Sequence, residues 1–323
     1  MNANRTPSII FFGTSSFAIP SLEALNAYDH QIIAIVTTPD RPAGRKKILT
    51  PPPIKKYIRD RGLNVPILQP VSLKIESIRE ELKALQPDLF IVAAYGKIIP
   101  KHILEIPRRG ALNIHPSLLP RWRGPSPIQY TILHGDTKTG VTIIQMDELM
   151  DHGSIVSASS FQLPASSTPT YSKLHEKLSR AAATLLIETL PRWLDGKIKP
   201  IPQDESKATY SKLLTKEDGK IDWSHPADEI ERMVRAFTPW PGAWTLWNGK
   251  RLRIEEAEFT KENSPSKKAG CVWQPAKDTL CVQAKTGSIR IKKLTLEGTP
   301  SMDTSQFLRG HPNIATAITF PPS

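Results

Sequence analysis

Short apolar runs alternate with segments of helical periodicity through the first part of the chain. The apolar runs lie at residues 8–12, 31–37, 65–68, 88–94 and 110–115. The segments between them carry apolar residues three or four positions apart, which is the spacing of one helix face. A continuous apolar run is typical of a strand buried on both faces, and strands that alternate with helices are typical of a parallel sheet. The pattern therefore predicts an α/β fold with an open, mostly parallel, Rossmann-like sheet.

This alternation stops after residue 139. Residues 140–146 and 154–163 have the pattern of two strands, which we expect to pair in antiparallel fashion. Thr168 and Pro169 then provide the N-cap and the first position of a long helix. The first domain is therefore expected to end with two added strands and one long helix.

The pattern of apolar and polar residues changes again beyond about residue 201. One helix is predicted at residues 228–237, and short strands follow at 243–247, 251–256, 270–273, 280–284 and 288–296. Asn248-Gly249 between apolar runs is a strong signal for a tight hairpin. Several short strands at close spacing indicate a small β-barrel. We therefore assign residues 1–206 to an α/β domain and residues 207–323 to a C-terminal β-barrel domain.

Composition narrows the class of protein. The 323 residues fit two domains at about 100–200 residues each. Cys271 and Cys281 are the only cysteines, which argues against a disulfide framework and against cysteine-rich metal sites. No run approaches the roughly 18 apolar residues of a membrane span, and the start of the chain does not read as a signal peptide. We expect a cytoplasmic protein with no membrane partner.

The charge is strongly positive and unevenly placed. The net charge is +12, and residues 41–61 contain eight Lys or Arg residues against one acid. Residues 267–293 contain seven Lys or Arg residues against one acid. A polyanionic partner such as a nucleic acid would account for both clusters. Solvated, merely basic loops would have the same composition, so charge alone leaves the partner open.

Two sequence segments bear on a phosphate site or a metal site, and neither matches well. Gly13-Thr14-Ser15 follows the first strand but lacks both G-x-G-x-x-G and a P-loop lysine, so a tight turn is the better interpretation. His115, His134 and His152 together with an aspartate do not match a zinc-ligand spacing. We predict no metal.

A polar pair lies at the end of one predicted strand. Asn113 and His115 are two positions apart, so both point to the same face of the sheet. Open parallel sheets bind ligands beyond the carboxyl ends of their strands. An asparagine amide can donate to a developing oxyanion, and a histidine can transfer a proton near neutral pH. A hydrogen-bonded histidine without a catalytic role is the alternative.

A carboxylate near His115 would orient its imidazole and stabilise its charged form. Residues 146–153 follow a predicted strand and offer three acids, Asp147, Glu148 and Asp151. Their spacing does not choose among them.

The motif as a whole resembles a known family. Asn113-Ile-His115-Pro-Ser117-Leu-Leu-Pro120 with Arg121-Trp-Arg-Gly124, followed by Met150-Asp151-His-Gly153, is similar to the formyltransferases that use 10-formyltetrahydrofolate. The resemblance implies a catalytic set of Asn113, His115 and Asp151. It also implies that the folate co-substrate is contacted by Ser117, Leu118, Leu119 and Pro120.

The rest of the chain resembles the methionyl-tRNA formyltransferases in particular. The shared segments are residues 12–14, 38–47, 69–70, 94–96, 221–223 and 235–242, so that nearly the whole chain is covered. The resemblance implies an oligonucleotide-binding-like (OB-like) C-terminal barrel, initiator methionyl-tRNA as the formyl acceptor, and a monomer. The implied tRNA contacts are Arg41, Arg45, Lys46 and Lys47 in a basic loop and Lys267, Lys268, Lys292 and Lys293 in the C-terminal domain.

Two departures from the family pattern lie beside the site. Pro116 follows the histidine where a small residue is commoner, and His152-Gly153-Ser154 replaces the usual Thr-Gly-Asp. Both are expected to alter loop shape, and neither removes Asn113, His115 or Asp151.

The implied reaction is direct formyl transfer to the methionyl amine. Asn113 and a protonated His115 would donate to the oxyanion, and Asp151 would orient His115 and help to move the amine proton. Three alternatives stay open: a formyltransferase for a small amine such as an amino sugar nucleotide, a formyl-folate hydrolase, and an RNA-binding protein without activity. The basic loop at residues 41–47 favours tRNA over a small amine.

Overall fold

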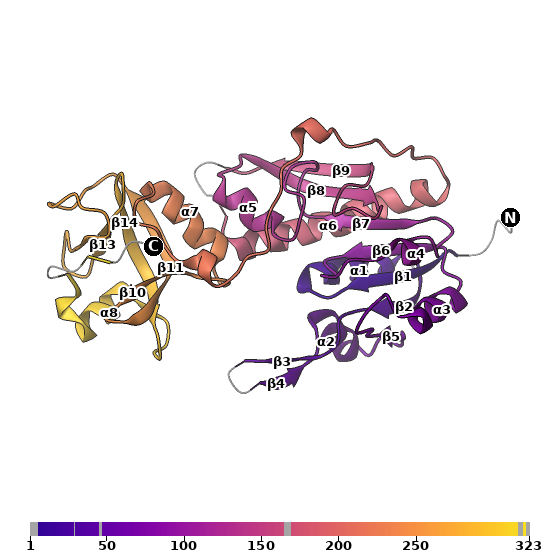
Figure 1. Ribbon diagram of the computed structural model, residues 1–323, viewed down its shortest axis with the longest axis horizontal. Helices are drawn as coiled ribbons and strands as arrows, with labels where there is room; N and C mark the ends of the chain where they lie inside the picture. The colour runs from indigo at the N-terminus through magenta and orange to yellow at the C-terminus, as the bar shows by residue number, and fades with distance from the viewer. Residues whose placement is uncertain (1–5, 29, 45–46, 165–168, 316–318, 321–323) are drawn as a thin grey trace. The chain divides into compact units, whose positions relative to one another are not determined.

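A computed structural model describes residues 6–28, 30–44, 47–164, 169–315 and 319–320. The chain divides into two compact units (Figure 1). The first unit comprises Met1–Pro127, Lys138–Gln162 and His175–Lys212. The second comprises Ile128–Thr137, Leu163–Leu174 and Leu213–Ser323.

The first unit contains a seven-stranded sheet in the order β5-β2-β1-β6-β7-β8-β9. Its strands are β1 (Ser8–Gly13), β2 (Gln31–Val36), β5 (Ile67–Leu68), β6 (Leu89–Ala93), β7 (Ala111–His115), β8 (Lys138–Gln145) and β9 (Ile155–Gln162). The strands from β5 to β7 pair in parallel, whereas β7–β8 and β8–β9 pair in antiparallel fashion. The predicted mostly parallel sheet and the predicted antiparallel strand pair are both confirmed.

The helices lie where the apolar periodicity placed them. They are α1 (Ile19–Ala27), α2 (Pro53–Asp60), α3 (Glu76–Ala84), α4 (Lys101–Leu104), α5 (Pro127–Leu133) and α6 (Tyr171–Leu194), with short 3₁₀ turns at η1 (Ser16–Ala18), η2 (Glu205–Lys207) and η3 (Glu217–Gly219). The proposed N-cap Thr168 lies outside the described residues.

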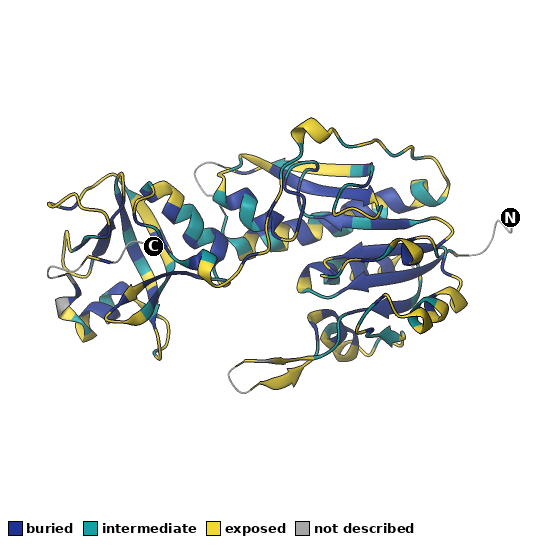
Figure 2. Ribbon diagram, viewed as in Figure 1, coloured by how far each residue is buried: buried dark blue, intermediate teal, exposed yellow. Residues whose placement is uncertain are grey.

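The central strands are buried on both faces (Figure 2). On one face, Phe12 of β1 packs against Phe90 of β6 with ring centroids 4.9 Å apart. Leu82 of α3 and Ile103 of α4 belong to the same apolar cluster. This packing fixes the strand ends, and therefore the positions of the polar residues that follow them.

The chain runs from β1 to β2 and β5 on one side of β1, then returns to β6 on the other side. A crevice at the carboxyl ends is expected where the strand order reverses. At this point a Cβ on Gly13 would come within 2.9 Å of Ala18 and Ile54. The backbone amide of Thr14 donates to the carbonyl of Ala94 at 3.2 Å. Gly13 therefore allows a close-packed turn, as its sequence context predicted.

The basic loop contains a hairpin that the sequence pattern did not reveal. Strands β3 (Arg41–Ala43) and β4 (Ile48–Thr50) pair in antiparallel fashion, with Arg41 opposite Thr50. The connection uses positive φ angles at Gly44 (69°) and Lys47 (49°). Both strands are short and carry little alternation of apolar and polar residues, so periodicity could not detect them.

The second unit contains α7 (Ala227–Phe237) and an antiparallel sheet in the order β10-β11-β14-β13-β12, with β15 paired to β14. Its elements are β10 (Ala243–Trp247), β11 (Lys250–Thr260), β12 (Val272–Trp273), β13 (Leu280–Gln283), β14 (Ser288–Leu296), β15 (Met302–Asp303), α8 (Thr304–Gly310) and η4 (Pro312–Ala315). The sheet curls into a half-barrel. It corresponds to the small β-barrel that the sequence predicts. Strand β15 and helix α8 were not predicted.

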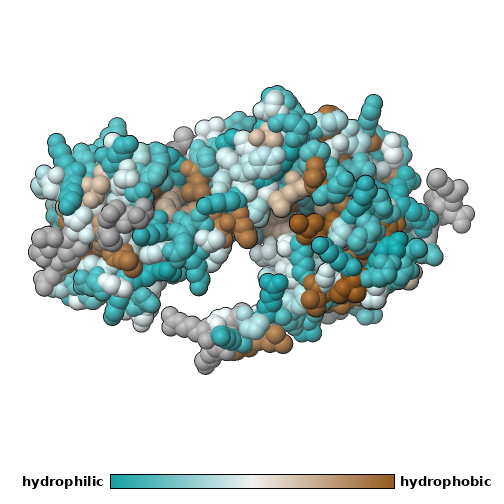
Figure 3. All heavy atoms as spheres, viewed as in Figure 1, coloured by the Kyte–Doolittle hydropathy of each residue, from teal (hydrophilic) through white to brown (hydrophobic). Residues whose placement is uncertain are grey.

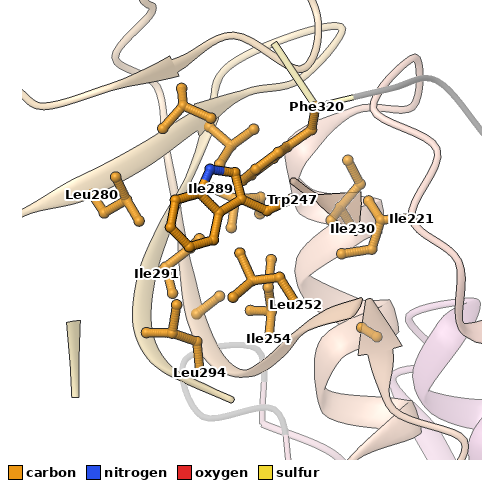
Figure 4. Close-up of a cluster of buried hydrophobic side chains, with 14 of the residues drawn as sticks. Ile221, Ile230, Trp247, Leu252, Ile254, Leu280, Ile289, Ile291, Leu294 and Phe320 are labelled. Carbon is orange, nitrogen blue, oxygen red and sulfur yellow. The ribbon is translucent and has the colours of Figure 1, made fainter. Parts of the chain in front are cut away.

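One apolar cluster holds this unit together (Figure 4). Trp247 of β10 packs against Phe307 of α8 with ring centroids 5.5 Å apart. Trp223 stacks on Phe320 at 5.8 Å, which ties the end of the chain to the segment before α7. The predicted Asn248-Gly249 turn joins β10 to β11, with both residues at positive φ.

Candidate functional site

The polar pair Asn113 and His115 lies on β7, next to β6 and β8 in the sheet. Asn113 is half-buried, whereas His115 is 4% exposed. A polar residue inside a strand is held rigidly by the ladder bonds on both sides, so the two side chains project from a fixed backbone.

The turn between β8 and β9 brings Asp151 to this pair. One Asp151 oxygen, Oδ1, accepts a hydrogen bond from Asn113 Nδ2 at 3.1 Å and lies 3.5 Å from His115 Nδ1. The other, Oδ2, accepts from the backbone amide of Gly124 at 2.8 Å. A single carboxylate therefore contacts both members of the predicted pair.

The other two candidate acids face elsewhere. Asp147 accepts from the backbone amide of Leu149 at 2.9 Å and from the imidazole of His152. Glu148 forms an ion pair with Lys101 at 3.3 Å. The geometry thus distinguishes three acids that sequence spacing left equivalent.

The surroundings of the His115 imidazole favour its charged form. Its Nε2 lies 2.9 Å from the carbonyl oxygen of Trp122, which can only accept a hydrogen bond. Its Nδ1 faces the Asp151 carboxylate, which also accepts. Burial disfavours the charge, but the charge of Asp151 and the hydrogen bonds to Asp151 and Trp122 outweigh it and raise the pKa of His115.

The pKa of the Asp151 carboxyl moves in the opposite direction. Burial would raise it, but the nearby His115 cation, the hydrogen bond from Gly124 and the charge of Arg123 lower it below the ordinary value. Both shifts favour the pair in which His115 is protonated and Asp151 is ionised.

The segment predicted to contact folate is a tightly bonded turn. Ser117 Oγ donates to the carbonyl of Arg121 at 2.6 Å. The hydroxyl of Thr142 on β8 accepts from the Leu119 amide at 3.1 Å and donates to the Ser117 carbonyl at 2.7 Å. Ser117 and Leu119 are buried, whereas Leu118 and Pro120 are half-buried. The side chains of Leu118 and Pro120 are therefore the ones with exposed surface.

A second layer of polar residues, which sequence reasoning missed, lies behind Asp151. The buried guanidinium of Arg123 contacts Gln203 and Glu205, and Gln203 in turn bonds the backbone on both sides of His152. Gln203 lies 80 positions after Arg123, and no periodicity or motif in the sequence connects the two.

The base of the β3–β4 hairpin is fixed by a buried lysine. Lys55 of α2 donates to both carboxylate oxygens of Asp40, at 2.8 and 2.9 Å, and also to Gln69. The Gln69 amide donates to Asp40 and to the carbonyl of Thr38, each at 2.8 Å. The hydrogen bonds from Lys55 and Gln69 lower the pKa of Asp40. This network positions the start of the hairpin.

The predicted basic contacts of the hairpin are described in part. Arg41 and Lys47 are exposed, and Arg45 and Lys46 lie outside the described residues. Ile48 and Leu49 on β4 are 63% and 65% exposed, and Figure 3 shows apolar surface on this hairpin beside polar atoms. The hairpin therefore presents cations and aliphatic side chains together.

The predicted basic contacts of the C-terminal unit differ among themselves. Lys267 and Lys268 are exposed in the loop after β11, and Lys293 is exposed on β14. Lys292 forms an ion pair with Glu258 of β11 at 3.0 Å. A neighbouring acid therefore offsets part of the positive charge counted in the sequence.

Neither a metal cluster nor a membrane span is found in the described part of the chain. No group of three His, Cys, Asp or Glu residues there has the geometry to hold a metal ion. No helix there is both long and apolar enough to cross a bilayer.

The chain matches two family models over most of its length. Residues 7–190 match the formyl transferase model, and residues 213–312 match the model of the formyl transferase C-terminal domain. The methionyl-tRNA formyltransferase of Chloroflexus aurantiacus is 45% identical over 302 residues, covering 94% of this chain and 96% of that protein. That of Bacillus velezensis is 39% identical and covers 94% of each chain.

The chain belongs to the methionyl-tRNA formyltransferase family.

Two solved structures share the fold of this chain. HypX from Aquifex aeolicus, in complex with tetrahydrofolic acid, superposes with a TM-score of 0.65 at 18% identity. The match covers 99% of this chain and 49% of HypX, so this chain spans about half of that protein. An N-formyltransferase from Helicobacter canadensis, in complex with folinic acid and dTDP-3-aminofucose, gives a TM-score of 0.63 at 16% identity. Both show the α/β architecture that the sequence predicts.

The charged pair in this formyltransferase makes a prediction for NMR. His115 should titrate above the ordinary histidine pKa of about 6.5. In Asp151→Asn the counter-charge is lost while the burial remains, so the pKa of His115 should fall below that of the wild-type protein. A ¹H–¹³C titration of the histidine Cε1 signals, assigned with His115→Gln, measures both values. Equal pKa values in the two proteins would contradict the assignment of Asp151 as the partner of His115.

Proposed function

We propose that this enzyme transfers the formyl group of 10-formyltetrahydrofolate to the free amino group of initiator methionyl-tRNA. Family membership at 39–45% identity supports the reaction. The observation that carries the proposal within the structure is the contact of Asp151 with both Asn113 and His115 at the end of β7. The sugar formyltransferase structures resemble this chain at 16–18% identity, which supports a shared fold.

The donors at the site fit a carbonyl oxygen that gains negative charge. Asn113 Nδ2 has two N–H bonds, and among the described residues one is taken by Asp151. The bond to Asp151 also fixes which end of the amide faces outward. We propose that the second N–H donates to the formyl oxygen while the nearby imidazolium of His115 stabilises the developing charge.

Asp151 has two roles in this proposal. Its carboxylate orients the Asn113 amide and keeps His115 charged, since it contacts both. The carboxylate is also proposed to accept the proton that the attacking amine releases, and this proton passes to N10 of the folate as the bond between N10 and the formyl carbon breaks.

The segment from Ser117 to Pro120 is proposed to contact the folate. When bound, 10-formyltetrahydrofolate supplies an already activated formyl group. The Ser117 hydroxyl is engaged with the Arg121 carbonyl, so Leu118, Pro120 and backbone groups are the surfaces left for the ligand. The turn is fixed by Thr142, which keeps it in place relative to Asn113 on the adjacent strand.

The basic residues are proposed to contact tRNA. Arg41 and Lys47 lie on a hairpin whose base is held by Lys55, and the sequence has two further cations between them, Arg45 and Lys46. In the C-terminal unit, Lys267, Lys268 and Lys293 are better candidates than Lys292, which is paired with Glu258.

We further propose that residues 1–206 form the catalytic domain and that residues 207–323 form the tRNA-binding domain. We also propose that the protein is a monomer and is cytoplasmic.

Formyl transfer measured with three acceptors tests the proposed reaction. Wild-type protein with 10-formyltetrahydrofolate should formylate methionyl-tRNA, and it should leave a dTDP-linked amino sugar and water essentially unreacted. Asn113→Ala should lower kcat about 100- to 1000-fold, which is the usual loss for one oxyanion donor. Asn26→Ala, at an exposed position of α1, is the matched control and should keep wild-type activity. Transfer to the amino sugar or to water in place of methionyl-tRNA would contradict the proposal.

The hairpin makes a separate prediction about tRNA affinity. Arg41→Gln should raise the KM for methionyl-tRNA and leave kcat close to the wild-type value, because Arg41 lies on the hairpin and not beside Asp151. The plot of log(kcat/KM) against log salt should lose about 0.7–0.9 of its slope, the value expected for one phosphate contact. Lys83→Gln on α3 removes another exposed cation and serves as the control. An unchanged KM and slope in Arg41→Gln would exclude a phosphate contact at Arg41.

A further inference from the structure

The side-chain amide of Gln203 makes four hydrogen bonds behind the candidate site. Its oxygen accepts from Arg123 Nε at 3.0 Å and from Arg123 Nη2 at 2.9 Å. Its nitrogen donates to the backbone carbonyls of Asp151 and Gly153, each at 2.8 Å. Both N–H bonds and the oxygen are therefore used, and the amide can face only one way.

Arg123 determines that orientation. Its side chain is almost fully buried, and its remaining N–H groups reach Glu205 at 2.6 and 2.9 Å and the Tyr210 hydroxyl at 3.3 Å. The backbone of Arg123 is also bonded, to Thr209 at 2.9 Å and to Ser211 at 2.7 Å. A guanidinium can only donate, so the Gln203 oxygen must point toward it and the Gln203 nitrogen must point toward the Asp151 turn.

The Asp151 turn needs such a support. Asp151 has a φ of 51°, in the left-handed region that costs a residue other than glycine about 1–2 kcal/mol. Gly153 leaves no room for a side chain, because a Cβ there would lie 1.9 Å from the carbonyl oxygen of Gln145. Gln203 bonds the carbonyls on both sides of His152, and therefore holds the strained turn in the conformation that points the Asp151 carboxylate at β7.

We propose that Gln203 is a positioning residue for formyl transfer, which holds the Asp151 turn so that one carboxylate stays in contact with both Asn113 and His115. Arg123 and Glu205 hold Gln203 in turn. Among the described residues, no hydrogen bond joins Gln203 to Asn113 or to His115, so Gln203 acts through Asp151. The proposal rests on the proposed function for its effect on catalysis, but its effect on His115 does not depend on which acceptor the enzyme uses.

Gln203→Glu removes the hydrogen bonds from Gln203 to the Asp151 turn and keeps an acceptor for Arg123. A glutamate keeps an oxygen for Arg123, so the buried guanidinium stays paired and the fold should be retained. The second glutamate oxygen would then face the carbonyls of Asp151 and Gly153, which lose both donors and meet a negative charge. The substitution therefore releases the Asp151 turn without removing the partner of Arg123. Gln162→Glu, at an exposed position of β9, makes the same chemical change away from the site and is the matched control.

The expected result is a change in kcat with little change in substrate binding. Gln203→Glu should lower kcat for methionyl-tRNA about 10- to 100-fold, because a displacement of about 1 Å at a catalytic group costs up to that factor. The KM values for methionyl-tRNA and for 10-formyltetrahydrofolate should stay within about twofold of wild type, and Tm should be close to wild type.

The titration of His115 by NMR provides the second readout. The charged groups around Asp151 are His115 on β7, Arg123 after it, Asp147, Glu148 and His152 in its own turn, and Glu205 beside Arg123 and His152. Gln203→Glu adds a negative charge that by itself raises the pKa of His115, so the neutral variant Gln203→Leu is used for this readout. Gln203→Leu removes all four hydrogen bonds, and the released turn should carry the Asp151 carboxylate away from His115, so the pKa of His115 should fall.

The outcomes separate this proposal from the proposed function. If the wild-type protein fails to formylate methionyl-tRNA but the pKa of His115 falls in Gln203→Leu, the substrate assignment is wrong and the positioning role stands. If kcat matches wild type in folded Gln203→Glu and the pKa of His115 matches wild type in folded Gln203→Leu, the positioning role is overturned whatever the substrate. A loss of kcat that only follows a loss of folded protein, with the pKa of His115 unchanged in the folded fraction, would also overturn it.

Discussion

The Asp151 carboxylate accepts a hydrogen bond from the Asn113 amide and lies beside the imidazole of His115, and the rest of the site depends on this shared contact. Asn113 needs it to present a fixed N–H, and His115 needs it to stay charged while it is buried. A buried cation without a partner is costly, so His115 would otherwise become neutral. The negative charge of the Asp151 carboxylate is stabilised in turn by His115 and by the hydrogen bond from the Gly124 amide.

The fold brings the three residues together by joining two kinds of strand pairing. Asn113 and His115 end the parallel part of the sheet, at the edge where α/β proteins bind ligands. The antiparallel strands β8 and β9 extend the sheet beyond β7, and the turn between them leaves β8 beside Leu112 and folds back so that Asp151 contacts Asn113 and His115. The fully buried strands β1 and β6 make this frame rigid. Asp151, the proposed catalytic carboxylate, thus lies in a turn, and the sheet and the hydrogen bonds from Gln203 set the position of that turn.

Sequence periodicity was sufficient for the elements that bury apolar residues. The parallel strands, the antiparallel pair and α7 are all confirmed, because each carries a regular apolar pattern. The hairpin at β3 and β4 was missed, since its strands are exposed and are held by contacts from Lys55 and Gln69 that lie elsewhere in the chain. The choice of Asp151 over Asp147 and Glu148 came from family resemblance, because a turn with positive φ has no periodic signature.

Neither periodicity nor motifs in the sequence could predict the polar contacts between residues far apart in the chain. Arg123 and Gln203 are far apart in the chain, and their pairing depends on the path of the segment after α6, which bridges β9 at Ile201. The pairing of Lys292 with Glu258 depends likewise on the register of β11 against β14. Charge counting along the chain gave the sign of the basic clusters correctly, but it could not show which cations have an acid beside them.

A double-mutant cycle on Asn113 and Asp151 tests the central claim most directly. Single-turnover formyl transfer to methionyl-tRNA would be measured for the wild type, Asn113→Ala, Asp151→Asn and the double variant. If one carboxylate orients the amide, the two residues act as a unit, and the double variant should lose far less than the product of the two single losses. Losses that multiply would mean that Asn113 and Asp151 act independently, and would contradict the account.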